Sequence, residues 1–286
     1  GTAPGFRTYY NKDQRSSELI ALPGGPREFR QMFSQHLLPQ LAKLASKRIE
    51  KHTFRIFGLP EAAVNSRLQP LAVPSGVIVS YRAAFPEIHV VLKNPGQAKE
   101  FLTFVDSVRA AIEPQYIFSE NANEGLLAYL HRLLIERKVT ISTAESCTGG
   151  MVATLLTELP GSSNYFLGGV GCYSNEVKQK FLGVTSEALE SMGAVSAVVA
   201  RQLAHGMRNQ TGSTFALSIT GVAGPDGGTP EKPVGTFFVG VATPDDVFAI
   251  KYYFNSTRDS VRKYAAYTAL DVLRRLLCQL PLPEVS

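Results

Sequence analysis

The stretch VTISTAESCTGG, residues 139–150, predicts the fold class of the carboxyl-terminal half of the chain. Its Val-, Ile- and Thr-rich start, Val139–Ala144, is typical of a buried strand, and its glycines begin a turn into a helix from about Gly150. Strands and helices alternate downstream, which predicts a mixed-sheet α/β layer domain. The further elements are strands at Gly168–Tyr173, Thr214–Thr220, Val234–Thr243 and Val247–Phe254, and helices at Asn175–Phe181, Ser196–Arg208 and Val261–Leu276.

This domain is expected to span residues 121–286 and to begin with a Leu-rich amphipathic helix from Leu126. Two further parts are predicted upstream of it. Residues 1–48 offer one extended piece, Glu18–Leu22, and a helix from Arg27, with no partner strand. They are expected to be the tail of a larger α/β domain that begins upstream of Gly1. Residues 49–120 predict a small α+β domain with strands at Thr53–Phe57, Val77–Tyr81 and Ile88–Leu92 and helices at Glu61–Leu68 and Ala98–Ile112.

Composition narrows the class of protein without choosing a function. The 286 residues are 44% hydrophobic and lack both a membrane-length apolar run and a signal-peptide start, so a cytoplasmic protein without a membrane partner is expected. The three cysteines show no CxxC spacing, which argues against a disulfide framework or a zinc site. The net charge of +5 suits either nucleic acid or a phosphorylated small substrate.

The turn Ala144–Gly150 places hydroxyl groups and glycines where α/β proteins bind ligands. Backbone N–H groups in such a turn and in the first helical turn are expected to be unpaired, free to bind a phosphate or a developing oxyanion. Ser146, Cys147 and Thr148 are all potential nucleophiles. An ordinary helix cap uses the same residue types, so the turn alone leaves both interpretations open.

A serine nucleophile needs a base. The domain offers His131 and His205, which both fall within predicted helices away from the strand ends. The sequence YSNEVK at residues 173–178 forms a second strand-to-helix junction, which brings Tyr173 and Lys178 to the same sheet edge as Ser146. A desolvated lysine near other cations loses its proton near neutral pH and then accepts one from serine. The alternative for this segment is an ordinary exposed lysine.

A third junction, TGVAGPDGG at residues 220–228, follows another predicted strand. Its glycines indicate either backbone that approaches a ligand or a long hairpin connection. Arg258, near the start of the last helix, suits bidentate binding of a phosphate or carboxylate, or else is a solvated charge. No Cys, His and Asp cluster has metal-ligand spacing, so no metal is expected.

Six ordered motifs in this domain resemble the CinA carboxyl-terminal family, also known as nicotinamide-nucleotide amidohydrolase. They are AESCTGG (144–150), PGSS (160–163), YSNEVK (173–178), GAVS (193–196), TGVAGPDGG (220–228) and KPVGT (232–236). Upstream, GTAPGF (1–6) and LPGGPREF (22–29) resemble the end of the family's molybdopterin-binding-like domain. FGLPEA (57–62) and YRAAFPEIHV (81–90) resemble its linker domain.

The resemblance implies that Ser146 is the nucleophile, with Lys178 and Tyr173 as its proton-handling partners. It implies hydrolysis of nicotinamide mononucleotide to nicotinate mononucleotide and ammonia, without a cofactor, in a homodimer. Cys147 is expected to pack rather than attack, because serine precedes it in the motif. Whether the turn takes the oxyanion or the phosphate is left open. The residues expected to contact substrate are Cys147, Thr148, Gly149, Gly150, Thr220, Gly221 and Arg258.

Two alternatives accompany this function. The positive charge and the family name, which refers to competence and DNA damage, allow a nucleic-acid-binding module, but residues 49–120 lack a GXXG loop and an RNP-like aromatic run. A Ser/Lys amidase of a different amide is the other alternative. The family's ADP-ribose pyrophosphatase activity is not predicted here, because the residues it requires are expected upstream of Gly1.

Overall fold

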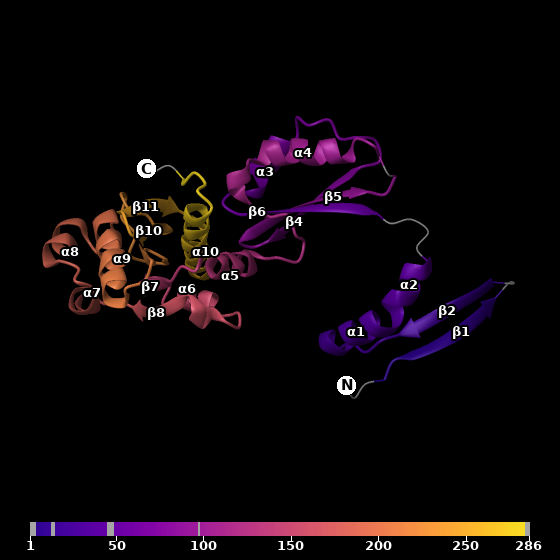
Figure 1. The fold of residues 1–286 in the computed structure, drawn as a ribbon, viewed down its shortest axis with the longest axis horizontal. Coiled ribbons are helices and arrows are strands. Elements are labelled where there is room, and N and C mark those ends of the chain that lie inside the picture. The colour runs from indigo at the N-terminus through magenta and orange to yellow at the C-terminus, as the bar shows by residue number, and fades with distance from the viewer. Residues whose placement is uncertain (1–3, 13–14, 45–48, 97, 284–286) are drawn as a thin grey trace. The chain divides into compact units, whose positions relative to one another are not determined.

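The chain forms two compact units in a computed structural model that describes residues 4–12, 15–44, 49–96 and 98–283 (Figure 1). One unit comprises residues 1–50 with 95–97, and the other comprises residues 51–94 with 98–286. The second and third predicted parts thus share one unit, and the division into three domains stays a prediction. The predicted boundary at residue 48 and the first three residues of the GTAPGF motif lie outside the described residues.

The first unit is built on an antiparallel hairpin of β1 (Phe6–Lys12) and β2 (Arg15–Ala21), in which Phe6 pairs with Ala21. The expectation that the extended piece near Glu18 lacks a partner strand is therefore wrong. Every described side chain of β1 is exposed, so backbone pairing forms the hairpin and no alternating apolar face marks the strand. The helical segments that follow are α1 (Pro26–Met32), η1 (Phe33–Leu37) and α2 (Leu38–Leu44).

The second unit contains a four-stranded sheet with the order β4-β5-β3-β6, and α3 and α4 lie along one of its faces (Figure 1). Buried residues of α4, from Phe101 to Ile112, recur every three or four positions and pack against the sheet. All five predicted elements are present, and β6 is too short to show a periodic pattern. The elements are β3 (Glu50–Ile56), α3 (Glu61–Leu68), β4 (Ile78–Ala84), β5 (Glu87–Asn94), α4 (Phe101–Ile112), η2 (Pro114–Tyr116) and β6 (Ile117–Ser119).

The carboxyl-terminal part of this unit contains a five-stranded sheet with the order β11-β10-β9-β7-β8. Strand β7 runs parallel to β8 and β9, whereas β10 is antiparallel to β9 and β11, so the predicted mixed-sheet α/β architecture is confirmed. The strands are β7 (Ile141–Glu145), β8 (Phe166–Gly171), β9 (Phe215–Gly221), β10 (Thr236–Ala242) and β11 (Val247–Tyr253).

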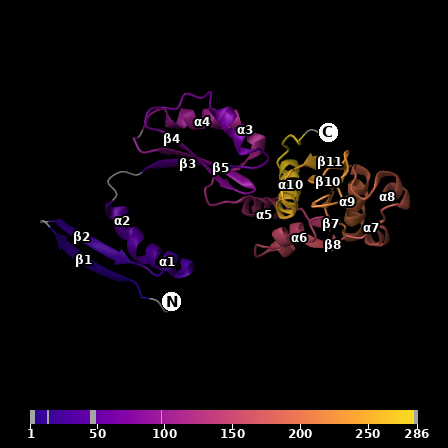
Figure 2. The same ribbon diagram turned by 180° about the vertical axis from the view of Figure 1, so that it is seen from behind.

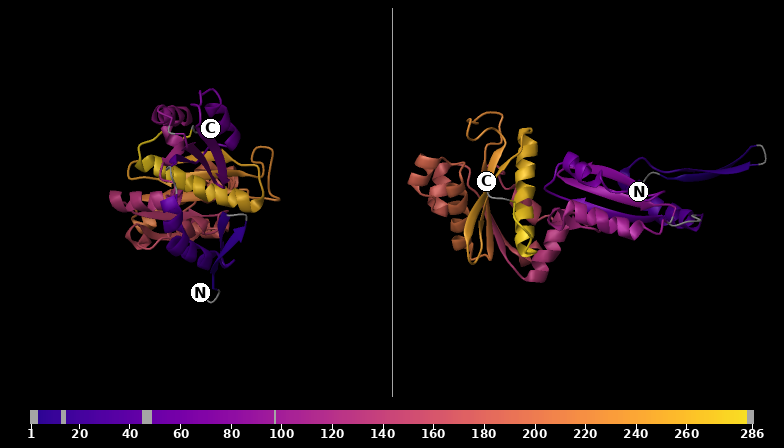
Figure 3. Two further views of the ribbon diagram at one scale, coloured as in Figure 1. Left: turned by 90° about the vertical axis from the view of Figure 1, so that its right-hand side faces the viewer. Right: turned by 90° about the horizontal axis from the view of Figure 1, so that it is seen from above.

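Helices cover both faces of the five-stranded sheet and make three layers (Figure 3). One face carries α7 to α9 and the other carries α5, α6 and α10, and α10 lies beside α5 when seen from behind (Figure 2). Helix α8 was not predicted. The helices are α5 (Leu126–Arg137), α6 (Met151–Leu156), α7 (Asn175–Leu182), α8 (Ser186–Met192), α9 (Ala197–Thr211) and α10 (Arg258–Leu277), with the short 3₁₀ turn η3 at Ser162–Asn164.

Side chains alternate between the two faces of the five-stranded sheet, and their size on each face determines how closely the helices pack against it. Leu217 and Ile219 of β9 face the layer of α5, α6 and α10, whereas Ala216 and Ser218 face α9. A Cβ atom on Gly240 of the adjacent strand would lie 2.3 Å from the carbonyl oxygen of Ala200, so glycine is needed there. Within the described residues, no helix combines the length and apolar character required to cross a membrane.

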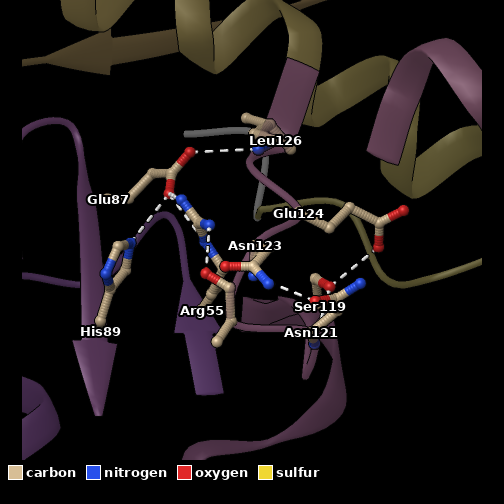
Figure 4. Close-up of polar contacts among 9 residues, drawn as sticks. Arg55, Glu87, His89, Ser119, Asn121, Asn123, Glu124 and Leu126 are labelled. Carbon is tan, nitrogen blue, oxygen red and sulfur yellow. Dashed lines mark hydrogen bonds and ion pairs between the residues drawn. The ribbon is translucent and has the colours of Figure 1, made fainter. Parts of the chain in front are cut away.

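Polar contacts join the four-stranded sheet to the start of α5 (Figure 4). The buried Glu87 carboxylate accepts hydrogen bonds from Arg55 Nη2 at 2.6 Å and from the backbone N–H of Leu126 at 3.1 Å, and His89 Nε2 lies 3.1 Å from it. A further contact joins the last turn of α10 to the segment before β6, where Arg274 donates to the carbonyl oxygen of Gln115 at 2.6 Å. These contacts explain why the two sheets pack as one unit.

Candidate active site

The register of the parallel strands brings three strand ends to one edge of the sheet. Glu145 at the end of β7 lies opposite Gly171 of β8 and Ile219 of β9. The backbone N–H of Ser146 donates to Ile219 O at 2.9 Å, and that of Cys172 donates to Glu145 O at 2.8 Å. The carboxyl ends of β7, β8 and β9 therefore lie side by side, with Ser146 and Tyr173 just after the first two strands and Thr220 near the end of the third.

Glu145 holds the helical side of the turn that carries Ser146. Its buried carboxylate accepts hydrogen bonds from the N–H groups of Gly150, Val152 and Ala153 at 3.0, 3.0 and 2.8 Å. The expectation that the N–H groups at the start of this helix are unpaired is therefore wrong for these three, since a carboxylate of the chain itself occupies the helix amino terminus. An external phosphate has no access to those donors.

Two amides of the turn stay available. Gly149 N–H donates to Ser146 O at 3.1 Å, whereas no other residue in the described part of the chain accepts from the N–H of Cys147 or Thr148, and the Cys147 N–H faces its own thiol. Gly149 and Gly150 have φ angles of 62° and 93°, a backbone conformation that favours glycine and allows the sharp turn after Ser146. The turn thus presents two adjacent donors directly after the candidate nucleophile.

Lys178 lies buried in the first half of α7 with 1% of its surface exposed. Ser174 caps this helix by accepting a hydrogen bond from the N–H of Val177, and Lys178 Nζ donates to the carbonyl oxygen of Tyr173 at 2.8 Å. Burial lowers the pKa of Lys178 below its usual value because the charged form is poorly solvated there. Lys178 is therefore more readily neutral than an exposed lysine, as a proton acceptor must be.

Tyr173 contacts Lys178 through its backbone and not through its phenol. The phenol side chain is 65% exposed, and its hydroxyl accepts a hydrogen bond from Arg258 Nη2 at 3.4 Å. Sequence reasoning placed Tyr173 and Lys178 at one sheet edge, and the structure adds that the phenol turns toward Arg258.

The first two turns of α10 contribute two arginines to this edge. Arg258 Nη1 donates to Gly224 O at 2.6 Å, which ties the glycine-rich segment after β9 to the helix. One turn later, Arg262 donates to Cys147 O and Thr148 O, each at 3.0 Å. Arg262 was not predicted, although its spacing of four residues from Arg258 puts both on one helix face. That spacing was the available signal.

Three of the other residues expected to contact substrate, Thr220, Cys147 and Thr148, are buried. Thr220 is buried and its hydroxyl donates to Ala194 O at 2.8 Å, and Gly221 pairs with Phe237 of β10. Burial raises the pKa of the Cys147 thiol to about 12, so this thiol stays protonated at neutral pH. The Thr148 hydroxyl is buried without a hydrogen-bond partner among the described residues.

Comparison with known proteins identifies this arrangement. Residues 123–277 match the family model for the CinA C-terminal domain. The chain belongs to the CinA family. It is 39% identical over 269 residues to a CinA-like protein of Desulfotalea psychrophila and 40% identical over 279 residues to one of Citrifermentans bemidjiense. These alignments cover 91% and 97% of the chain but only 65% and 66% of the two relatives.

Solved structures of competence- or damage-inducible proteins match about half of the chain. The competence/damage inducible protein CihA of Agrobacterium tumefaciens matches with a TM-score of 0.51 and 39% identity over 53% of this chain and 96% of that one. The competence damage-inducible protein A of Klebsiella pneumoniae matches with a TM-score of 0.53 and 30% identity over 56% of this chain and 100% of that one. Both protein names refer to competence or damage, and neither names a reaction.

The two histidines of this domain lie on helices and contact residues outside the junctions that carry Ser146 and Tyr173. His131 Nδ1 lies 3.0 Å from the Tyr165 hydroxyl, and His205 lies 2.9 Å from the Asn209 amide in α9. Across residues 4–12, 15–44, 49–96 and 98–283, no group of three or more His, Cys, Asp or Glu side chains is arranged to hold a metal ion. Lys178 follows the strand that pairs with β7, and it is therefore the candidate base for Ser146.

Proposed function

We propose that this chain hydrolyses the carboxamide of nicotinamide mononucleotide to give nicotinate mononucleotide and ammonia, with Ser146 as the nucleophile. The observation that carries the proposal is Lys178, a buried lysine with a lowered pKa at a strand end that adjoins the strand end of Ser146. Serine is activated by an adjacent base, and a neutral lysine is such a base. The substrate itself comes from the family resemblance.

The reaction divides into two halves that use the same residues. In the first, Ser146 Oγ bonds to the carboxamide carbon while its proton passes to Lys178, and ammonia leaves after the amide nitrogen takes up that proton. In the second, water attacks the resulting ester, gives up a proton to Lys178 and releases the carboxylate product as Ser146 regains its hydrogen. The sum is amide plus water to carboxylic acid plus ammonia.

The turn after Ser146 suits the charge that develops on the substrate oxygen. No other residue in the described part of the chain accepts from the N–H groups of Cys147 and Thr148, so they are the donors left for this oxygen. The Glu145 carboxylate, which would repel an anion, is buried and turned to the helix start. We assign the oxyanion, and not the phosphate, to this turn.

Arg258 and Tyr173 suit the phosphate side of the substrate. Arg258 lies at the amino terminus of α10, where the helix dipole also favours negative charge. The phenol of Tyr173 is exposed beside it and offers a further hydrogen-bonding group. A cytoplasmic location and a homodimer belong to this proposal through composition and family resemblance. A Ser/Lys amidase of another amide uses the same machinery and differs only in this binding region.

The test is incubation of the purified chain with nicotinamide mononucleotide in the presence of a metal chelator. Ammonia and nicotinate mononucleotide are expected in equal amounts, because the proposed steps need no metal. The matched control is Ser146→Ala under the same conditions. Equal product from both proteins, or none from either, rejects the proposed function, and turnover of a different amide alone assigns the same chemistry to another substrate.

A further inference from the structure

We propose that Arg262 is a positioning residue that aims the backbone N–H of Thr148 at the oxyanion formed when Ser146 attacks a carbonyl carbon. This inference rests on the proposed function. Arg262 lies in the second turn of α10, and its Nε and Nη2 donate to the carbonyl oxygens of Cys147 and Thr148, each at 3.0 Å. The planar guanidinium thus spans two consecutive peptide groups with a fixed fork.

The two contacts of Arg262 determine the directions of the Thr148 and Gly149 N–H groups, because the geometry of a peptide group is fixed. In a trans peptide, the carbonyl of one residue and the N–H of the next point in opposite directions, and the peptides of this turn are trans. Because Cys147 O faces Arg262, the Thr148 N–H faces away from it. Because Thr148 O also faces Arg262, the Gly149 N–H faces away too, where it donates to Ser146 O at 3.1 Å. Arg262 therefore fixes two peptide planes at once.

Within the described residues, Arg262 is the one side chain that hydrogen-bonds to the peptide between Cys147 and Thr148. Glu145 restrains the turn farther on, at Gly150 and in the first turn of α6. Gly149 adjoins the restrained segment and rotates more freely than any other residue type. Backbone hydrogen bonds also hold the Thr148–Gly149 peptide, because Gly149 N–H donates to Ser146 O and Thr148 O accepts from Met151 N–H. Without Arg262, the Cys147–Thr148 peptide has no other restraint of this kind within the described residues and can turn the Thr148 N–H away from the substrate.

The charge of Arg262 adds to its effect on direction. A carbonyl oxygen that accepts a hydrogen bond from a cation polarises its own amide group, which makes the N–H of that amide a stronger donor. An oxyanion hole lowers the barrier because its donors are already oriented before charge develops. Arg262 supplies both features from behind the turn, without contact with the substrate.

The test compares wild type with Arg262→Ala and Arg262→Lys, and Arg137→Ala serves as a matched control, because Arg137 is exposed at the end of α5. One readout is kcat and KM for nicotinamide mononucleotide. The other is the rate at which a fluorophosphonate labels Ser146, which needs the same oxyanion donors but no nucleotide. R262A is expected to lose about 10²-fold in kcat and in labelling with KM little changed. R262K, with a single point donor, is expected to fall between R262A and wild type.

Added guanidinium ion at millimolar concentration is expected to restore part of the R262A activity and none of a Ser146→Ala protein. A folded R262A with wild-type kcat and labelling overturns the inference, and so does a change confined to KM, which would mean that Arg262 binds substrate. If R262A does not fold, R262K decides by the same comparisons. The wild-type protein could be inactive on nicotinamide mononucleotide while its labelling still depends on Arg262. That result rejects the proposed substrate and supports the inference. Wild type that shows neither activity overturns both.

Discussion

Ser146→Ala is expected to lower kcat for nicotinamide mononucleotide by about 10⁴-fold or more, whereas Cys147→Ala keeps most of the wild-type rate. The reason is the difference between two neighbours in one turn. Cys147 is buried, and burial raises its pKa to about 12, so the thiol is protonated at pH 7. Ser146 is less buried, follows β7 directly, and precedes the Cys147 and Thr148 amides, from which no other described residue accepts a hydrogen bond.

Steady-state kinetics on both variants check this prediction, with circular dichroism to show that each is folded. Cys147→Ser belongs in the set, because it preserves a polar side chain of similar size while removing the thiol. An active Ser146→Ala protein together with an inactive, folded Cys147→Ala protein would contradict the mechanism even if the substrate is correct.

Lys178→Ala is expected to lower kcat by about 10³-fold, and Lys178→Arg by a similar amount. Arginine keeps the positive charge but does not release its proton in proteins. The Lys178→Arg variant therefore distinguishes a lysine that accepts a proton from a lysine that acts only through its charge. The Ser146→Ala/Lys178→Ala double variant should be scarcely slower than either single variant, because residues that act as one proton-transfer unit give non-additive losses. Single and double variants measured side by side check this.

The pH dependence of the wild-type rate provides a second measurement on Lys178. Burial lowers the pKa of this lysine, so its neutral form is more abundant at a given pH than that of an exposed lysine. The catalytic rate should therefore rise with pH and level off below the range in which ordinary lysines titrate. A rate that climbs through that range without levelling would show that Lys178 remains charged and is not the base.

The fold of the carboxyl-terminal part was predictable because nearly every element carries its own apolar pattern. The buried strands β7 and β9 and the periodic face of α10 all showed it, with bounds within a few residues of the structure. Elements that lacked the pattern were missed. Strand β1 is exposed on both faces, β6 has three residues, and α8 buries only Ala188.

The sequence predicts which residues of the candidate site lie at the ends of neighbouring strands, but not which contacts their side chains make. Ser146 and the Tyr173 to Lys178 segment follow adjacent parallel strands, so topology alone brings them together. The contacts that depend on side-chain direction were out of reach. Glu145 looked like part of a binding motif and instead caps α6, while Arg262 depends on the rotation of α10 about its axis.

Trapping the covalent intermediate tests the central claim, attack by Ser146 on the carboxamide, most directly. Wild-type protein is mixed with nicotinamide mononucleotide, quenched in acid within one turnover, digested and analysed by mass spectrometry. We expect a nicotinate mononucleotide ester on Ser146 that is absent from Ser146→Ala. The ester should be more abundant without hydroxylamine than with it, because hydroxylamine competes with water for the ester. An adduct on Cys147 or Thr148, or steady turnover with no adduct on any residue of the turn, would contradict the claim.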